Sequence, residues 1–181
     1  MTERVIMAGF GGQGLMLLGK LLAQVAMEEG KNVTFFPSYG TEVRGGTANC
    51  HVIISDGEIF SPVVEDADSL ITMNQASYAR FCGLVKPDGV TFYNSSMVHP
   101  TSSNNGASLA IPATEIAANL GNTRVGNMVM MGAYNAMKKI VSTEGILEYL
   151  KKMLTGKKAD LLEINCRALD HGREIYKRSG L

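Results

Sequence analysis

Residues 5–14, Val-Ile-Met-Ala-Gly-Phe-Gly-Gly-Gln-Gly, decide the fold that this chain of 181 residues is expected to adopt. The apolar run 5–8 is short and ends in glycine, which is typical of a strand buried on both faces of a sheet. Leucine, alanine and methionine fill most of residues 15–27, and Glu28-Glu29-Gly30 then predicts a helix end. A strand, a glycine turn and a helix in succession predict an α/β protein.

The glycines of this stretch follow the pattern G-x-G-x-x-G between the predicted strand and the predicted helix. Glycine allows a tight turn and a close backbone approach, and a helix N-terminus offers unpaired N–H groups to an anion. The candidate binding residues are therefore Gly9, Gly11, Gly12, Gln13 and Gly14. The alternative is that these glycines only let the strand turn tightly into its helix.

Two common nucleotide-binding motifs are incomplete. A dinucleotide site requires an acidic residue about 20 positions after the glycines, to hold a ribose hydroxyl. The second predicted strand ends instead in Phe35-Phe36-Pro37, and Glu42 comes only later, in another glycine-rich loop. No Gly-Lys-Ser/Thr follows the first loop, which excludes a Walker phosphate loop.

The second loop, Ser38–Gly46, carries a tyrosine, a carboxylate and a guanidinium within six residues. It follows the second strand, at the sheet edge where ligand crevices form in open α/β sheets. Arg44 could bind a phosphate or carboxylate through two hydrogen bonds, and Glu42 could orient it. Equally, the two could form an ion pair that only braces the loop. The candidate binding residues of this loop are Ser38, Tyr39, Gly40, Glu42, Arg44, Gly45 and Gly46.

The rest of the chain alternates strands and helices and ends in helices. Further strands are expected at 33–36 (stopped by Pro37), 48–55, 58–60 after a hairpin turn at Asp56-Gly57, 69–73, 90–93 after a turn at 87–89, and 109–111. Helices are expected around 78–81 and from 113 onward, interrupted at 121–122 and around 142–145, with a polar loop at 95–107. We expect one domain over residues 1–181: an α/β protein, a three-layer α/β/α sandwich with a Rossmann-like, mostly parallel but mixed sheet.

Two asparagines complete the candidate set. Asn74 ends a predicted strand and Asn127 opens a predicted helix, so both could face the same crevice; the favoured alternative for Asn127 is a helix N-cap. We expect no catalytic residue and no metal site, because the sequence contains no triad, no metal-ligand cluster and no paired carboxylates.

Composition restricts the function classes. Lysine plus arginine equal aspartate plus glutamate at 17 each, so no net charge favours nucleic acid or an anionic membrane. No apolar run approaches the roughly 20 residues of a membrane helix, and no signal-peptide pattern is present. Three widely spaced cysteines form no disulfide framework or cluster motif. The protein is expected to be cytoplasmic.

The two loops, in this order, resemble the gamma subunit of 2-oxoacid:ferredoxin oxidoreductases and the equivalent fused domain of pyruvate:ferredoxin oxidoreductases. The resemblance extends through 47–52, 73–75, 84–90 and 126–132, and so covers most of the chain. Thr41 departs from it, because related chains often carry proline there.

The resemblance implies that the chain is inactive alone and works with alpha and beta subunits and, in some complexes, a delta subunit. The whole enzyme, which would belong to anaerobic metabolism, would cleave a 2-oxoacid with thiamine diphosphate and form an acyl-CoA. It would pass electrons through iron–sulfur clusters to ferredoxin. Thiamine diphosphate and the clusters would belong to the partner subunits. This chain would bind no cofactor tightly, but would line the coenzyme A site and support assembly. Because the gamma-type unit is a separate small chain here, 2-oxoglutarate is the favoured substrate. Pyruvate, branched-chain oxoacids and indolepyruvate stay open as alternatives.

Two other functions stay open. One is an independent Rossmann-type oxidoreductase that binds NAD, which the missing ribose acid and the missing substrate domain disfavour. The other is a purely structural assembly module whose loops only dock onto partner subunits.

Overall fold

The computed structural model describes residues 1–40, 46–100, 106–156 and 159–181, and its strands form one six-stranded sheet in the order β2-β3-β1-β4-β5-β6. The strands are β1 (Thr2–Phe10), β2 (Asn32–Tyr39), β3 (Thr47–Ser55), β4 (Ala67–Thr72), β5 (Val85–Asn94) and β6 (Ala107–Ile111). The helices of the described residues are α1 (Leu15–Glu28), α2 (Gln75–Phe81), α3 (Ala113–Asn119), α4 (Gly126–Lys138), α5 (Thr143–Met153) and α6 (Leu161–Ser179), with 3₁₀ turns at Cys82–Leu84 and Thr123–Val125.

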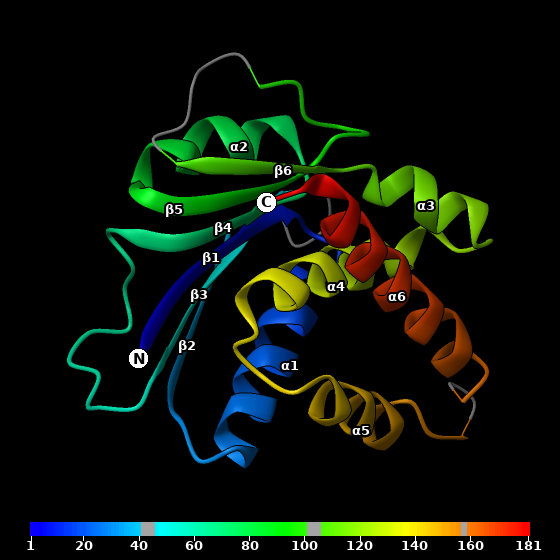
Figure 1. Cartoon of the computed structure of the whole chain (residues 1–181), viewed down its shortest axis with the longest axis horizontal. Helices are drawn as coiled ribbons and strands as arrows, with labels where there is room; N and C mark the ends of the chain where they lie inside the picture. Colours follow the sequence, from blue (N-terminus) through cyan, green and yellow to red (C-terminus); the bar gives the residue numbers. More distant parts are fainter. Residues whose placement is uncertain (41–45, 101–105, 157–158) are drawn as a thin grey trace.

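The helices are distributed unequally over the two faces of the sheet (Figure 1). On one face α1 covers β1, β2 and β3, α4 lies against β5 and β6, and α5 and α6 pack on these two helices. This side holds the larger core. On the other face α2 covers β1 and β4 over a smaller core that includes Ile6, Leu70 and Phe81. No helix in the described segments has the length and apolar character needed to cross a membrane.

The predicted three-layer α/β fold with a mixed sheet is confirmed, but the antiparallel strand differs from the predicted one. β3 runs antiparallel to both β1 and β2, whereas β1, β4, β5 and β6 are mutually parallel. The predicted strand 58–60 is wrong, because those residues belong to a loop that crosses the sheet face. Asp56-Gly57 does turn the chain, but Asp56 is held by Lys31 and the N-terminal amine instead of starting a hairpin.

Two predicted strand boundaries, the stop at Pro37 and the turn at 87–89, lie inside strands. Pro37 does not stop β2, which continues to Tyr39 with Pro37 opposite Cys50. An edge strand tolerates proline because one side of its ladder needs no N–H donor. Residues 87–89 lie within β5, where the register with β4 moves from Ala67–Val85 to Ser69–Val90. This irregularity absorbs the extra residues that were expected to form a separate turn.

The predicted breaks in the helical half are confirmed by capping side chains. Asn122 accepts a hydrogen bond from the Arg124 N–H at 3.1 Å, between α3 and α4. Ser142 accepts one from the Gly145 N–H at 3.0 Å, at the N-terminus of α5. Side-chain oxygens thus satisfy N–H groups that lack a partner in a first helical turn.

Helices α4 and α6 pack with their backbones in close contact, and two glycines make this possible. A Cβ atom added at Gly172 would lie 1.9 Å from the Val129 carbonyl oxygen, and one at Gly132 would lie 2.0 Å from the Leu169 carbonyl oxygen. No side chain can turn away from a clash at its own Cβ. The separation of the two helices is therefore fixed by these positions.

A buried carboxylate joins β1, β4 and α4 at the amino ends of the parallel strands. Glu3 is 5% exposed, and it accepts hydrogen bonds from Ser69 Oγ at 2.6 Å and the Tyr134 hydroxyl at 3.5 Å. Lys138 Nζ lies 3.3 Å from its other oxygen. Burial raises the pKa of Glu3 above its ordinary value, although Ser69 and Lys138 oppose the shift.

Replacing Gly172 by alanine should lower the free energy of unfolding by roughly 1–3 kcal/mol, because the new methyl group forces α4 and α6 apart. Gly83→Ala is the matched control, since a Cβ there meets nothing within 4 Å. Urea denaturation monitored by circular dichroism measures both. Equal stability of the two variants would contradict the close-packing argument.

The raised pKa of Glu3 predicts a pH-dependent stability. Between 4.5 and the higher folded-state pKa, the folded protein holds more protons than the unfolded chain, so its unfolding free energy falls as pH rises. Glu3→Gln lacks this titration, so the stability of the wild type relative to this variant should fall as pH rises above 4.5. Urea titrations at several pH values measure it, with Glu148→Gln on α5 as control. Parallel pH curves for wild type and Glu3→Gln would refute it.

Candidate functional site

The carboxyl ends of β1 and β4 form a topological switch point. These neighbouring strands are parallel, and the helix after β1 lies on one face of the sheet while the helix after β4 lies on the other (Figure 1). Open α/β sheets bind ligands in the crevice outside such a pair of strand ends. Here these strand ends lead into loop 9–14 and Met73-Asn74, and we call the position between them the crevice.

The glycines of loop 9–14 meet distinct constraints. Gly12 and Gly14 have φ angles of 102° and 77°, which side chains rarely adopt. A Cβ at Gly14 would also lie 2.4 Å from Asn127 Nδ2, and one at Gly9 would lie 2.5 Å from Gln13 Oε1. Gly12 is exposed, and a Cβ there would meet nothing within 4 Å. The absence of a side chain at Gly9 and Gly14 thus leaves room for Gln13 and Asn127, whereas the backbone of Gly12 is exposed to solvent.

The Gln13 side chain fills the crevice itself. Its Oε1 accepts a hydrogen bond from the Phe10 N–H at 2.7 Å and a longer one from Asn74 Nδ2 at 3.4 Å. Its Nε2 donates to the Met73 carbonyl at 3.4 Å. One amide thus connects the end of β1 to the end of β4, and fixes the loop that leads into α1.

The N-terminus of α1 is suited to an anion. Its N-cap is Gly14, and within the described parts of the chain no side chain caps it and no acidic residue stands in its first turn. The first N–H groups of a helix lack intrahelical partners and carry the positive end of its dipole. These donors lie beside the exposed backbone of Gly12.

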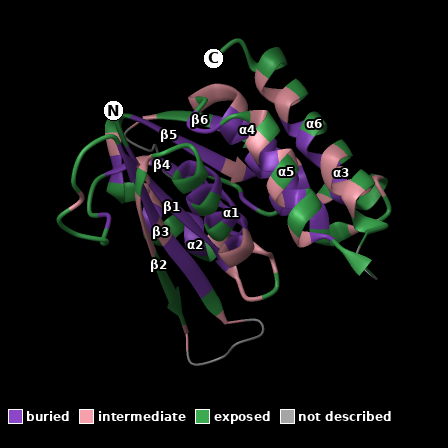
Figure 2. Cartoon of the chain, turned by 90° about the horizontal axis from the view of Figure 1, so that it is seen from below, coloured by how far each residue is buried: buried purple, intermediate pink, exposed green. Residues whose placement is uncertain are grey.

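The last residue of the second loop, Gly46, contacts the first loop just before β3 begins. The Gly11 N–H donates to the Gly46 carbonyl at 2.9 Å, and the Gly40 N–H donates to the Thr47 carbonyl at 2.8 Å. Ser38 and Tyr39 are exposed at the rim of the molecule, where β2 ends (Figure 2). Of the candidate residues, Glu42, Arg44 and Gly45 lie outside the described residues.

Both candidate asparagines are buried at the crevice, in structural contacts. Asn74 is the N-cap of α2, accepting from the Ser77 N–H at 2.8 Å. The favoured N-cap interpretation of Asn127 is wrong, because the N-cap of α4 is Val125. Asn127 Nδ2 instead donates to the Gly14 carbonyl at 3.1 Å, and its Oδ1 accepts from Met128 N–H. The Asn127 side chain therefore ties α4 to the glycine loop.

Asn94, which was not among the residues predicted from the sequence, is the third asparagine of the crevice. It is fully buried at the end of β5, and its Nδ2 donates to the Met73 carbonyl at 3.3 Å and to Thr114 Oγ1 at 2.8 Å. The signal was available, because Asn94 directly follows the predicted strand 90–93, as Asn74 follows its own.

The nearby titratable side chains are arranged for packing. Burial raises the pKa of the Cys50 thiol to about 12, so the nucleophilic thiolate is unavailable near neutral pH. Burial lowers the pKa of His51, whose Nδ1 accepts a hydrogen bond from the Val64 N–H at 2.9 Å. That contact requires the unprotonated nitrogen.

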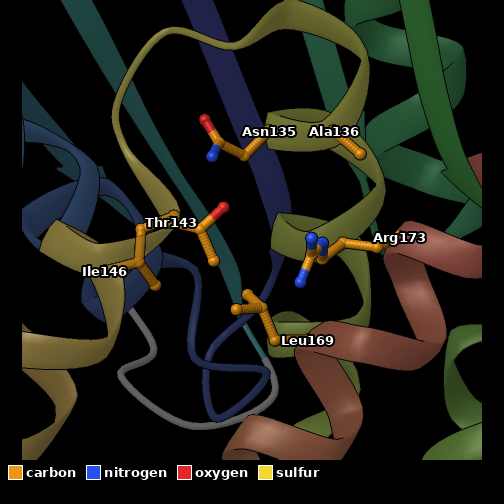
Figure 3. Close-up of a pocket in the computed structure, with 7 residues that line it drawn as sticks. Asn135, Ala136, Thr143, Ile146, Leu169 and Arg173 are labelled. Carbon is orange, nitrogen blue, oxygen red and sulfur yellow. The ribbon is translucent and has the colours of Figure 1, made fainter.

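A separate small cavity between α4, α5 and α6 (Figure 3) adjoins an open hollow of about 430 Å³ that shares some of its lining residues. Arg173, Asn135 and Thr143 are among the residues that line the small cavity, and the volume of this cavity is about 10 Å³. That is roughly the space one water molecule needs.

The sheet order disfavours a bound dinucleotide. A Rossmann site places a parallel strand beside β1, with a ribose-binding acid at its carboxyl end. Here the antiparallel β3 occupies that place and presents Thr47, the start of a strand, next to the loop. Because the Gln13 side chain also fills the crevice, the exposed backbone of loop 9–14 remains as the candidate binding surface.

Comparison with known proteins gives a consistent family. Residues 4–175 match the family model described as pyruvate ferredoxin/flavodoxin oxidoreductase. Ketoisovalerate oxidoreductase subunit VorA of Methanothermobacter marburgensis is 35% identical over 97% of this chain, which spans only 37% of VorA. 2-Oxoglutarate synthase subunit KorC of Archaeoglobus fulgidus is 32% identical over 94% of this chain and 86% of its own length. The crystal structure of a keto/oxoacid ferredoxin oxidoreductase gamma subunit from Geobacter sulfurreducens shares the fold, with a TM-score of 0.83, 28% identity, and coverage of 98% of this chain and 99% of the other.

Replacing Gln13 by alanine should release the glycine loop, because the Phe10 N–H and the Met73 carbonyl both lose a partner. We expect a loss of about 1–3 kcal/mol in unfolding free energy and faster hydrogen exchange at the Phe10 amide. Gln24→Ala on the exposed face of α1 is the control, since Gln24 bonds only to Glu28 among the described residues. Unchanged exchange at Phe10 would show that Gln13 does not hold the loop.

Proposed function

Because the chain belongs to the pyruvate ferredoxin/flavodoxin oxidoreductase family, we propose that it is the gamma-type subunit of a cytoplasmic 2-oxoacid:ferredoxin oxidoreductase. In this proposal the whole enzyme decarboxylates a 2-oxoacid with thiamine diphosphate, transfers the acyl group to coenzyme A and passes two electrons through iron–sulfur clusters to ferredoxin. Alpha and beta subunits, and a delta subunit where one is present, hold those groups. The chain is a single gamma-type domain and supplies a binding surface.

The observation that carries the proposed role is the N-terminus of α1, which no described side chain caps, beside the exposed backbone of Gly12. Coenzyme A carries a pyrophosphate and a 3′-phosphate, and backbone N–H groups at a helix N-terminus are suited to such anions. We assign the phosphate contacts to the Gly12 backbone and the first turn of α1. Arg44 in the second loop is the candidate charged contact.

The remaining residues of the loop hold this surface in place. Gln13 fixes the loop across the strand ends, and Asn127 fixes Gly14 from the side of α4. Donors fixed before binding lose little conformational freedom when the ligand arrives, which favours affinity. The chemistry itself belongs to the cofactor in the partner subunits.

A second function is favoured by the filled crevice. If Gln13 and the three asparagines only brace strand ends, the loops serve assembly and no ligand contacts them.

The two relatives named above carry the names of different oxoacids, ketoisovalerate and 2-oxoglutarate. The proposal therefore commits to a 2-oxoacid and leaves its side chain open.

The test compares Gly12→Ala with Gly30→Ala in the assembled enzyme. Both glycines are exposed, have positive φ (102° and 80°) and have open space around a new Cβ, so the conformational cost of about 1 kcal/mol should be alike. Only the Gly12 methyl group would block approach to the loop backbone. We expect the KM for coenzyme A to rise about 10-fold in Gly12→Ala with kcat unchanged, and to stay unchanged in Gly30→Ala.

The measurement uses the tagged chain purified anaerobically with its bound subunits, and follows ferredoxin reduction by a 2-oxoacid against coenzyme A concentration. Equal KM values in the two variants, with normal subunit recovery, would leave only the assembly role. Recovery of the chain alone, with no oxidoreductase activity, would refute the proposed function.

A further inference from the structure

An apolar surface lies on the sheet face that α2 leaves open. Loop 56–66 crosses this face beyond β3, and its Phe60 side chain is 93% exposed. Val63 in the same loop and Phe36 on β2 are 44% and 43% exposed. Together with half-buried Ile59, they form what we call the Phe60 patch, and Ile59 and Phe60 line two hollows of about 340 and 220 Å³.

The loop that carries Phe60 is fixed to the sheet at both ends. At its start, Asn32 Nδ2 donates to the Gly57 carbonyl at 3.1 Å, and the Gly57 N–H donates to Ser55 Oγ at 3.1 Å. Near its end, the Val64 N–H donates to His51 Nδ1 at 2.9 Å, and the Val64 side chain is buried in the smaller core. Phe60 is therefore exposed in a loop whose two ends are fixed to the sheet.

Three carboxylates near the patch have no cationic partner. Among the described residues, no cation pairs with the exposed side chains of Glu58, Glu65 and Asp66. The nearby cations already have carboxylate partners, Lys31 and the N-terminal amine at Asp56, and Arg4 and Lys86 at Asp68. A partner suited to this surface has an apolar pocket surrounded by lysine or arginine.

We propose that the Phe60 patch is the contact through which this chain binds a partner subunit of the oxidoreductase, with Phe60 in an apolar pocket that has a basic rim. This inference rests on the proposed function. An exposed aromatic residue at the centre of a polar-rimmed patch is the usual form of an interface hot spot. In VorA the region equivalent to this chain is continuous with a longer polypeptide, so that relative joins such a domain to other parts covalently.

The same features disfavour other occupants. A second copy would bring three more unpaired carboxylates to the contact and no unpaired cation to match them, and the same carboxylates disfavour an anionic membrane. The β2 edge lacks a backbone donor at Pro37, which disfavours pairing with a further strand.

The test titrates the purified chain against its partner subcomplex under anaerobic conditions. Phe60→Ala should raise the dissociation constant by about 10-fold or more, whereas the control Met27→Ala, at an exposed apolar residue (56%) on α1, should leave it unchanged. The pair Glu65→Lys and Asp66→Lys should weaken binding and reduce its dependence on salt concentration. Phe60 is exposed, so the urea midpoint of Phe60→Ala should match that of the wild type.

Equal affinities for Phe60→Ala and Met27→Ala would overturn the inference while leaving the proposed function intact. A self-associated chain that Phe60→Ala makes monomeric would overturn it in favour of a homodimer contact. If the wild-type chain binds no oxidoreductase subunit at all, the proposed function and this inference both fail.

Discussion

The amide of Gln13 is the contact on which the geometry of the candidate site depends. It satisfies the Phe10 N–H and reaches the Met73 carbonyl, and thereby joins two strand ends that are not connected through the local chain. It can do so only because Gly9 has no side chain, since a Cβ there would meet Gln13 Oε1. The close passage of Gln13 over Gly9 directs the chain into α1 and leaves the backbone at Gly12 exposed.

The helical layer supports the same loop from the other side. Asn127, in the first turn of α4, donates to the Gly14 carbonyl, and α4 is itself held against α6 by the close contacts at Gly132 and Gly172. A helix pair locked by backbone contact cannot shift without cost, because packed interiors have few voids. The position of the glycine loop is therefore coupled to the packing of the carboxyl-terminal helices.

The side chains of the candidate site are poorly suited to reaction chemistry. The crevice is lined by amides, which neither titrate nor act as nucleophiles near neutral pH. The Cys50 thiol has its pKa raised to about 12, and His51 is engaged in holding the loop that presents Phe60. In the described parts of the chain no group of three His, Cys, Asp or Glu side chains could hold a metal. Such a surface fits a subunit that positions a substrate for cofactors held elsewhere.

Local sequence patterns were enough to predict the strand–glycine loop–helix unit, the α/β class, the helical breaks near residues 121 and 142, and the family. Those features depend on local patterns, namely apolar periodicity, glycine turns and capping side chains. The three-dimensional contacts were needed to see that β3 separates β1 from β2, that Pro37 lies within an edge strand, and that Asn127 bonds to Gly14 instead of capping its helix. Strand order and side-chain partners depend on contacts between residues far apart in the chain, about 113 positions for Asn127 and Gly14, and no local pattern encodes them.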